Sequence, residues 1–498
     1  MKQPSVQARR RAFDGRDPPS TICSPVRLTN DLGQVWWWVL LLGVVAASAL
    51  GGESTPAPTP APDAPPVCAP AAPAPAEDAS VSEEDDADPP LKVPKRSDEA
   101  PIASFKSIPK EYDLLQKAKL DKATGKLMLE RDGKPAPLTI DPVLQDQLTR
   151  ILRDYQTPYA AAVAIEPSTG RVLALAEHAE ADPSLRGLPE APIFPAASVF
   201  KVVTASALLG EGISPDETEC FHGGKRRLSA KLLEDSSRDS RCVTLSEALG
   251  MSANVAFAKF TSRALTADKL RAMARAYRFN RQIDFPIPMG ISLAAIPDDP
   301  MGLPTAGAGF GDVYLSPLHG ALMAAVPANK GAWRDAVLFE QDAPTSPPQD
   351  PPRVIPEPDA RSLASMMEQT VTIGTAHRIF RQRAFRVPGA VGKTGCLADR
   401  NPFRDYTWFI GYAPKDDPKV AVAAVIVNDY LWRIRATWLG REAMRLALEG
   451  QSRWAKPLVA AVPTEPPPDF TIQVFPPPDL TQDAPAIGGG GSPPTGSP

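Results

Sequence analysis

Ser198 and Lys201, three residues apart, are the side chains in this sequence best suited to nucleophilic chemistry. Pro195 precedes them, and a mostly apolar run over 199–209 follows and stops at Gly210. A proline at the start of such a run and a glycine at its end predict a buried helix. Residues three apart on a helix share one face, so the hydroxyl and the amine can meet there.

Such a pair has the parts of an activated nucleophile. An amine in an apolar wall loses its proton more easily than one in water, and it can then accept the hydroxyl proton. A backbone N–H at a helix start can also stabilise a developing negative charge. Ser107-Ile108-Pro109-Lys110 has the same spacing, but its proline resists a helix and no apolar run follows it. We therefore expect Ser198, and not Ser107, to be the nucleophile.

A second pair of polar residues, Ser252 and Asn254, lies in a stretch predicted to be helical over 244–260. Taken alone, a hydroxyl and an amide two residues apart usually form a helix cap or a loop hydrogen bond. The pair therefore indicates a catalytic role only when it occurs together with other motifs.

A third motif, Gly392-Lys393-Thr394-Gly395, follows the apolar Ala390 and Val391. A phosphate-binding loop would need a glycine where the chain has Val387, and then a helix where residues 399–402 predict a turn. We expect instead a strand that presents Lys393 and Thr394, with glycines that let a ligand backbone come close.

Composition narrows the class of protein. The 498 residues include 58 prolines, which cluster at both ends, so the folded part is shorter than the chain. A net charge of −4 gives no case for a nucleic-acid partner. No cysteine pair has metal-ligand spacing and the four histidines form no metal-binding pattern, so we expect no metal and no cofactor.

The N-terminal region predicts a membrane anchor. Residues 32–52 carry no charge and are about as long as the roughly 20 residues that span a bilayer. Basic residues precede this segment and acidic ones follow it, which predicts a cytoplasmic tail over 1–31 and a single-pass anchor over 32–52. The alternative is a cleaved signal peptide, because Ala47-Ser48-Ala49 resembles a cleavage site; the long segment before it favours the anchor.

The remainder divides into a spacer, a folded domain and a tail. Residues 53–100 are rich in proline and alanine and then acidic, which predicts an extended linker, and residues 456–498 predict a disordered tail. Within the domain, 101–455, we expect strands at 160–165, 171–176, 390–395, 406–412 and 420–427, and helices at 143–155, 244–260, 361–371 and 438–448. This order predicts an α+β fold with a helical insertion.

Cys220 and Cys242 form a candidate disulfide. The predicted topology puts them in an oxidising space, where disulfides persist. They flank a polar, arginine-rich loop, so we expect a bridge between them.

The three motifs occur in one order: Ser198-x-x-Lys201, Ser252-x-Asn254 and Lys393-Thr394-Gly395. This order is the signature of serine acyl-transferases that react with penicillin. Residues of about 138–448 resemble the transpeptidase domain of penicillin-binding proteins, and the similarity extends to the segments 167–174, 307–321 and 407–414. The resemblance implies an antiparallel sheet flanked by helices, with a helical subdomain.

The resemblance also implies roles for the catalytic residues. Ser198 would attack the carbonyl between two D-alanines of a peptidoglycan stem peptide, and Lys201 would take its proton. Ser252 and Asn254 would relay the proton and hold the substrate amide, and Lys393 would set the electrostatics of the site.

On the same strand, Thr394 would bind the substrate carboxylate beside Gly395 and Cys396. The backbone N–H groups of Ser198 and Cys396 would form the oxyanion hole. The family usually has threonine where this chain has Cys396, so one hydroxyl is lost and the backbone donor is kept.

The resemblance implies a transpeptidase in the bacterial inner membrane, with its catalytic domain in the periplasm. Its partners would be stem peptides, β-lactams as covalent inhibitors, the membrane through 32–52, and other cell-wall synthesis proteins. A D,D-carboxypeptidase would use the same residues with water as acceptor. A β-lactamase-like hydrolase, an inactive scaffold and a β-lactam sensor are further alternatives, although Ser198 and Lys201 are both present.

Overall fold

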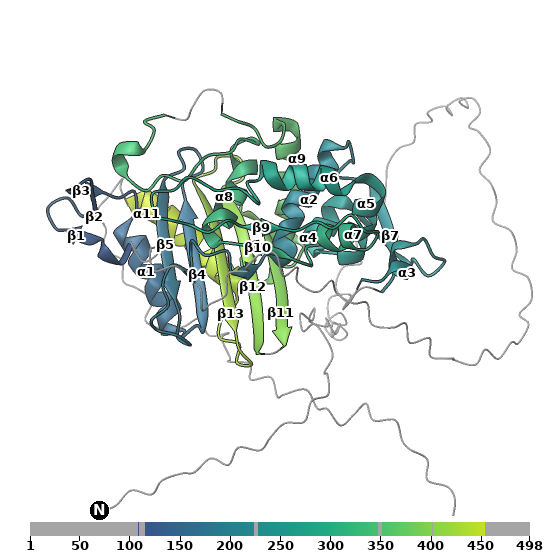
Figure 1. Ribbon diagram of the computed structural model, residues 1–498, viewed down its shortest axis with the longest axis horizontal. Helices are drawn as coiled ribbons and strands as arrows, with labels where there is room; N and C mark the ends of the chain where they lie inside the picture. The colour runs from purple at the N-terminus through teal and green to yellow at the C-terminus, as the bar shows by residue number, and fades with distance from the viewer. Residues whose placement is uncertain (1–107, 109–114, 224–227, 347–350, 401, 454–498) are drawn as a thin grey trace, which may run out of the picture. The chain divides into compact units, whose positions relative to one another are not determined.

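The computed structural model describes residues 108, 115–223, 228–346, 351–400 and 402–453 (Figure 1). The predicted tail, anchor, linker and C-terminal segment lie outside these residues, as do Ser107, Lys110 and the cleavage-like segment 47–49. Within the described part, no helix is long and apolar enough to span a membrane. Among the same residues, no group of three histidine, cysteine or acidic side chains could hold a metal ion.

Five antiparallel strands form the main sheet, in the order β11-β12-β13-β4-β5. Their bounds are Tyr159–Ile165 for β4, Val172–His178 for β5, Val391–Arg400 for β11, Phe403–Ala413 for β12 and Val420–Asn428 for β13. Every residue of β13 is buried. Its almost continuous apolar sequence suits a strand covered on both faces, because neither set of alternating side chains reaches water.

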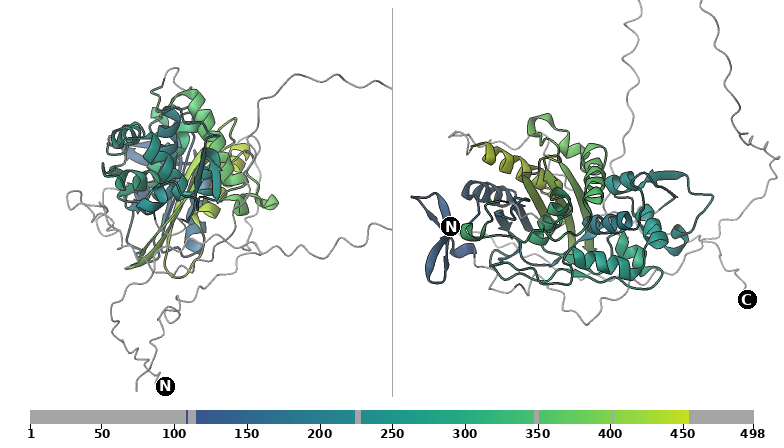
Figure 2. Two further views of the ribbon diagram at one scale, coloured as in Figure 1. Left: turned by 90° about the vertical axis from the view of Figure 1, so that its right-hand side faces the viewer. Right: turned by 90° about the horizontal axis from the view of Figure 1, so that it is seen from above.

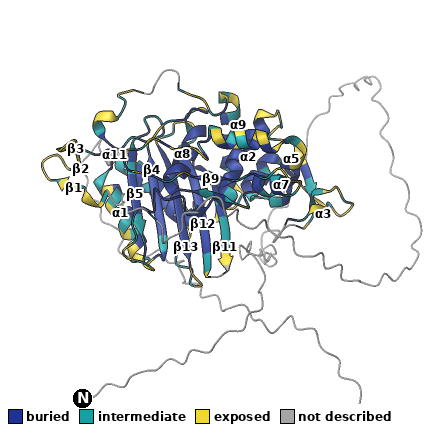
Figure 3. Ribbon diagram, viewed as in Figure 1, coloured by how far each residue is buried: buried dark blue, intermediate teal, exposed yellow. Residues whose placement is uncertain are grey.

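Helices cover both faces of this sheet (Figures 1 and 2). Val420, Val422 and other alternate residues of β13 belong to a core that includes α11 (Ala436–Arg453) and α1 (Pro142–Asp154). The intervening residues belong to a core on the opposite face that includes α8 (Pro317–Ala328). Figure 3 shows the inner parts of the sheet and of α8 as buried.

The remaining larger helices form a second region beside the edge strand β11 (Figure 1). They are α2 (Lys201–Gly210), α4 (Leu245–Met251), α5 (Asn254–Ala264), α6 (Ala267–Ala276), α7 (Gly302–Gly307) and α9 (Glu357–Thr372). In this region α2 packs against α5 and α6, and α4 and β11 both pack against α9. The predicted α+β fold with a helical insertion is therefore confirmed.

Shorter elements connect these layers. They are the strands β6 (Phe194–Pro195), β7 (Thr218–Phe221), β8 (Arg241–Thr244), β9 (Leu293–Ala294) and β10 (Val313–Leu315), the helices α3 (Ala230–Leu233) and α10 (His377–Phe380), and the 3₁₀ turns η2 (Ala197–Phe200), η3 (Glu340–Asp342) and η4 (Arg383–Phe385).

Three expectations about local structure need correction. The helix expected after Pro195 begins as the 3₁₀ turn η2 at Ala197 and becomes α-helical only at Lys201. The single helix expected over 244–260 is two helices, because Ser252 has φ +56° and ends α4. A sheet of three short strands, β1 (Lys119–Asp121), β2 (Lys126–Arg131) and β3 (Lys134–Pro137), was not expected at all.

Candidate active site

Ser198 lies on η2, where the chain passes from the short strand β6 into the buried helix α2. The residue before it, Ala197, has φ +49°. A left-handed conformation in a residue other than glycine costs on the order of 1–3 kcal/mol and is common at functional sites. Gly309 makes room for this turn: a Cβ there would collide with Ala197 O and come within 3.0 Å of Ser198 Cα.

Lys201, the first residue of α2, is fully buried beside Ser198. Its Nζ lies 2.9 Å from Ser198 Oγ, 2.8 Å from Asn254 Oδ1 and 2.6 Å from Ala308 O. The amide and carbonyl oxygens can only accept hydrogen bonds, whereas the serine hydroxyl can accept or donate. A neutral amine has two protons and one lone pair, so it can donate to Asn254 and Ala308 and accept from Ser198.

Electrostatics favour that neutral amine. Burial holds the pKa of Lys201 well below its ordinary value, and the charge of Lys393 lowers it further. The three oxygen atoms that Lys201 Nζ contacts among the described residues carry no negative charge that would oppose these effects. The site therefore contains a buried amine that can accept the proton of Ser198.

Ser252 and Asn254 are placed by the break between α4 and α5. Thr244 and Glu247 form a capping box at the start of α4, and Ser252 ends that helix in a left-handed conformation. Two residues later, Asn254 begins α5. The break directs Asn254 to Lys201 and Ser252 to Lys393, whose Nζ lies 2.9 Å from Ser252 Oγ.

Lys393, Thr394, Gly395 and Cys396 follow one another on β11, the edge strand of the main sheet. Side chains alternate along a strand, so Lys393 and Gly395 share one face and Thr394 and Cys396 the other. Lys393 is fully buried and also donates to Thr394 O at 2.8 Å. Burial lowers the pKa of Lys393 to about 7.

Close packing holds β11 against the segment that leads to Ser198. A Cβ on Gly395 would lie 3.2 Å from Ala196 O, so a larger residue would push the two segments apart. The neighbouring strand contributes Trp408, whose Nε1 donates to Pro195 O at 2.9 Å. Its ring packs edge-on against Phe194, with 5.9 Å between the ring centroids.

Sequence reasoning missed three residues of this site. Ala308 supplies the carbonyl that binds Lys201, and Gly309 accommodates the turn at Ser198. Thr375 places its Oγ1 2.5 Å from Thr394 Oγ1. For Ala308 and Gly309 the sequence does contain a signal, the family similarity of the segment 307–321. The sequence around Thr375 contains no comparable signal.

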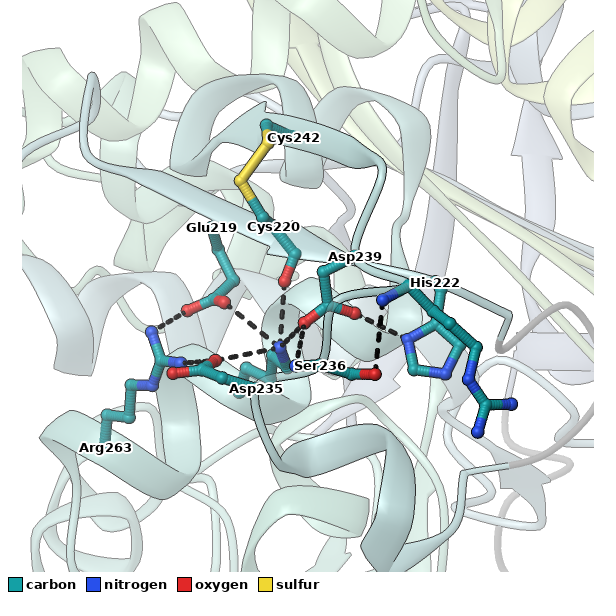
Figure 4. A network of polar contacts seen from close by, with 10 residues as sticks. Glu219, Cys220, His222, Asp235, Ser236, Asp239, Cys242 and Arg263 are labelled. Atoms are coloured by element: carbon teal, nitrogen blue, oxygen red, sulfur yellow. Dashed lines mark hydrogen bonds and ion pairs between the residues drawn. A yellow bond between two sulfur atoms is a disulfide. The ribbon is translucent and has the colours of Figure 1, made fainter. Parts of the chain in front are cut away.

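An ion-pair network centred on Lys259 anchors α5 to neighbouring segments (Figure 4). Lys259 of α5 is fully buried, and its Nζ donates to Cys220 O at 2.9 Å and to Asp239 Oδ2 at 2.7 Å. Asp235 Oδ1 and Glu219 Oε1 lie 3.2 and 3.6 Å from the same nitrogen. The helix that begins at Asn254 is thus tied by Lys259 to the hairpin of β7 and β8.

The same hairpin carries the expected cysteine pair. Cys220 of β7 and Cys242 of β8 face each other in the strand register and are joined by a disulfide. Two residues later, Thr244 caps α4, the helix that ends at Ser252. The disulfide therefore lies in the hairpin that precedes α4 and is not among the candidate catalytic residues.

The structure brings together most of the residues singled out in the sequence. At the junction of η2, the α4–α5 break and β11 lie Ser198, Lys201, Ser252, Asn254, Lys393, Thr394 and Gly395. Cys396 is half-buried on the same face of β11 as Thr394.

Comparison with known proteins gives one matching family model, described as the penicillin binding protein transpeptidase domain, over residues 160–437. The peptidoglycan D,D-transpeptidase PbpA of Mycolicibacterium smegmatis is 31% identical over 316 residues, a match that covers 56% of this chain and 63% of the relative. The protein of that name from Mycobacterium tuberculosis is 30% identical and is covered to 67%. The chain thus spans about two thirds of these relatives.

Solved structures agree with the sequence matches. The crystal structure of PBPA from Mycobacterium tuberculosis has a TM-score of 0.52 and 25% identity, and the alignment covers 63% of this chain and 81% of the other. A structure of penicillin-binding protein A from the same organism, described as an imipenem acyl-enzyme complex, has a TM-score of 0.50 and 26% identity over 64% and 81% of the two chains.

Proposed function

The chain belongs to the penicillin-binding protein transpeptidase family, and from this premise we propose that it is a peptidoglycan D,D-transpeptidase acting through a serine acyl-enzyme. The observation that carries the proposal is the contact of a buried, weakly basic Lys201 with the hydroxyl of Ser198. The relatives that are 30–31% identical are named as D,D-transpeptidases, which favours this activity over a hydrolase.

In the acylation step, Ser198 Oγ attacks the carbonyl carbon between two D-alanines while its proton passes to the lone pair of Lys201. Asn254 Oδ1 and Ala308 O hold the other two protons of the amine and so keep the lone pair on Ser198. The tetrahedral intermediate collapses, the bond to the terminal D-alanine breaks, and its nitrogen leaves with a proton. General-base assistance of this kind contributes typically about 10²–10⁴-fold.

In the transfer step, the amine of a second stem peptide attacks the acyl-enzyme carbonyl. Ser198 Oγ leaves and regains a proton, and an amide cross-link between two stem peptides remains. The same acylation by a β-lactam would leave a stable acyl-enzyme, so β-lactams are expected to be covalent inhibitors. The backbone N–H groups of Ser198 and Cys396 would stabilise the oxyanion in both steps.

Binding of the donor peptide is assigned to the groups around β11. Thr394 would donate to the terminal carboxylate, and Lys393 would supply positive charge beside it. Lys393 would also orient Ser252, which it contacts, for passing a proton to the leaving amine. Asn254 would hold the donor amide, with Gly395 and Cys396 lining the same strand.

We further propose that residues 32–52 form a single membrane anchor and that the catalytic domain works in the periplasm, on a linker over 53–100. The charge asymmetry around 32–52 supports this orientation. The disulfide between Cys220 and Cys242 also favours an oxidising compartment.

Labelling with a fluorescent penicillin tests the proposed chemistry. One adduct per chain, mapped to the peptide that contains Ser198, is the expected result, and Ser198→Ala should abolish it. Ser107→Ala, in the tetrad that has no apolar run after it, is the matched control and should label normally. Adducts that persist in Ser198→Ala, or that disappear in Ser107→Ala, would refute the assignment.

The reaction itself needs a donor ending in D-Ala-D-Ala and an amine acceptor. Mass spectrometry should detect the joined product together with free D-alanine. A product shortened by one D-alanine and never joined to the acceptor would make the protein a carboxypeptidase.

A further inference from the structure

Thr375 lies next to Thr394, although the two residues come from different elements. Thr375 follows the end of α9, and Thr394 is on β11. Their hydroxyl oxygens are 2.5 Å apart, and the side chain of Thr375 is exposed. The pair therefore stands where a ligand of β11 can reach it.

The backbone holds Thr375 in this place. Its N–H donates to Gly250 O at 3.1 Å, and the N–H of Ala376 donates to Thr370 O at 2.9 Å. Gly374 has no space for a side chain, because a Cβ there would collide with Gly250 O. The end of α9 is thus packed onto the last turn of α4, two residues before Ser252, so Thr375 has a fixed position between α4 and β11.

The direction of the hydrogen bond between the two hydroxyls decides what Thr394 can do. A threonine hydroxyl has one proton to donate, and an ionised carboxylate can only accept. If Thr394 donates to Thr375, no proton is left for a carboxylate. If Thr375 donates to Thr394, the proton of Thr394 is available. The other acceptor near the Thr375 hydroxyl, Gly250 O, lies 3.5 Å away and is a weak competitor.

We propose that Thr375 is a positioning residue for the carboxylate of the acyl donor. Its hydroxyl donates to Thr394 Oγ1, and Thr394 then donates to the carboxylate. Hydrogen bonds in such a chain polarise one another, so the contact to the carboxylate is stronger than one from an isolated threonine. This inference rests on the proposed function, since it concerns the ligand of Thr394.

The test measures acylation of the full chain by two compounds, a β-lactam that carries a carboxylate and the methyl ester of the same β-lactam. The ester has no negative charge at this position. Acylation rates measured over a series of β-lactam concentrations give two separate quantities: the dissociation constant of the noncovalent complex, and the limiting rate of acylation within it. Thr375→Val removes the hydroxyl and keeps the shape, Thr375→Ser keeps the hydroxyl, and Thr372→Val is the control. Thr372 is exposed on α9, and its hydroxyl donates within the helix to Glu368 O.

We expect Thr375→Val to weaken binding of the carboxylate about three- to tenfold, because the neutral hydrogen bond that orients Thr394 is lost while Thr394 itself can still reach the carboxylate. The limiting acylation rate and the affinity for the ester should change less than twofold. Thr375→Ser should restore the wild-type affinity, and Thr394→Val should make the Thr375→Val substitution almost silent.

Two outcomes would overturn the inference. An equal loss for acid and ester in Thr375→Val would show that the residue only supports the structure, and an unchanged affinity for the acid would show that it does not act on the carboxylate. Failure of the proposed function looks different, because Ser198 of the wild-type protein would then not be acylated by either compound.

Discussion

Lys201 and Lys393 are both fully buried, and the charge of Lys393 adds to the burial that holds the pKa of Lys201 well below its ordinary value. Burial lowers the pKa of Lys393 as well, to about 7. Burial thus favours the neutral form of both lysines, and the charge of Lys393 favours it further at Lys201. Together, burial and the nearby charge favour an amine without its third proton next to Ser198, which a single exposed lysine would not provide.

This coupling predicts how acylation depends on pH. The rate should rise with pH as Lys201 loses its proton and fall again as Lys393, whose pKa is about 7, loses its own. Lys393→Met removes the charge that lowers the pKa of Lys201, so the rise should move to higher pH, and the limiting rate should fall because Ser252 loses its partner. Stopped-flow acylation between pH 5 and pH 9 measures both effects. Lys269→Met, at an exposed lysine, is the control, and a rise at the same pH in Lys393→Met would contradict the coupling.

The turn that carries Ser198 depends on Gly309. Its φ is +85°, and an added Cβ would collide with Ala197 O. We expect Gly309→Ala to displace Ser198 and to lower the acylation rate at least about tenfold, since small misplacements of reacting groups are costly. Gly311→Ala is a matched control: its φ is +81°, but a Cβ there meets nothing within 4 Å. If both variants acylated equally slowly, backbone strain and not the contact with Ala197 would be the cause. If both had the wild-type rate, Gly309 would not be needed for the turn.

Much of the site could be predicted because its chemistry depends on residue type and on short spacings. Ser198 and Lys201 lie within four residues, and the buried helix after them has a clear apolar run. The contact between Thr375 and Thr394 could not be predicted in this way. It arises because α9 packs onto the end of α4, and the glycines that permit this packing, Gly250 and Gly374, look ordinary in the sequence.

The expected positions of the strands along the chain followed from apolar runs, and β13 is the clearest case. The sheet of β1 to β3 was missed because its strands are short, each begins with a lysine, and the last contains two prolines. A signal was nevertheless present: Asp132 and Gly133, with φ +53° and +75°, form the tight turn that joins β2 and β3. The break at Ser252 was missed because both sides of it have helical patterns, and only tertiary contacts place a serine in a left-handed conformation.

A buried carboxyl group on β12 predicts how stability depends on pH. Asp405 is 1% exposed, and burial raises its pKa to about 7, although the charge of Arg435 opposes this. In the unfolded chain the pKa is about 3.9. Between these values the folded state binds one proton more, so the free energy of unfolding falls as pH rises, by up to about 1.4 kcal/mol per unit.

Asp405→Asn cannot ionise, so the variant should lose this fall in stability. The two proteins should differ little at pH 4 and most above pH 7, where the variant should be the more stable one. Urea unfolding at several pH values measures the difference. Asp146→Asn, at an exposed carboxylate, should leave the slope unchanged. A constant difference between Asp405→Asn and the wild type at all pH values would contradict the prediction.

The network around Lys259 predicts a large effect on stability far from Ser198. Lys259 is fully buried among Glu219, Asp235 and Asp239, and Glu219 is 3% exposed. Lys259→Met keeps much of the volume but removes the cation that the three carboxylates share, and leaves, among the described residues, only Arg263 beside Glu219 and Asp235 and His222 beside Asp239. Breaking a buried ion pair from one side typically costs about 3–5 kcal/mol, and we expect about 3 kcal/mol here because Asp235 reaches solvent.

Thermal and urea unfolding of Lys259→Met should show this loss. Lys269→Met is the matched control: Lys269 pairs with Glu211 at the surface, and such pairs contribute at most about 1 kcal/mol. If the loss comes from uncompensated charge, adding Asp239→Asn to Lys259→Met should recover part of it, because asparagine can still bind the N–H of Ser236 and need not be ionised. A double variant that is less stable than Lys259→Met would show that packing, and not charge, is what Lys259 provides.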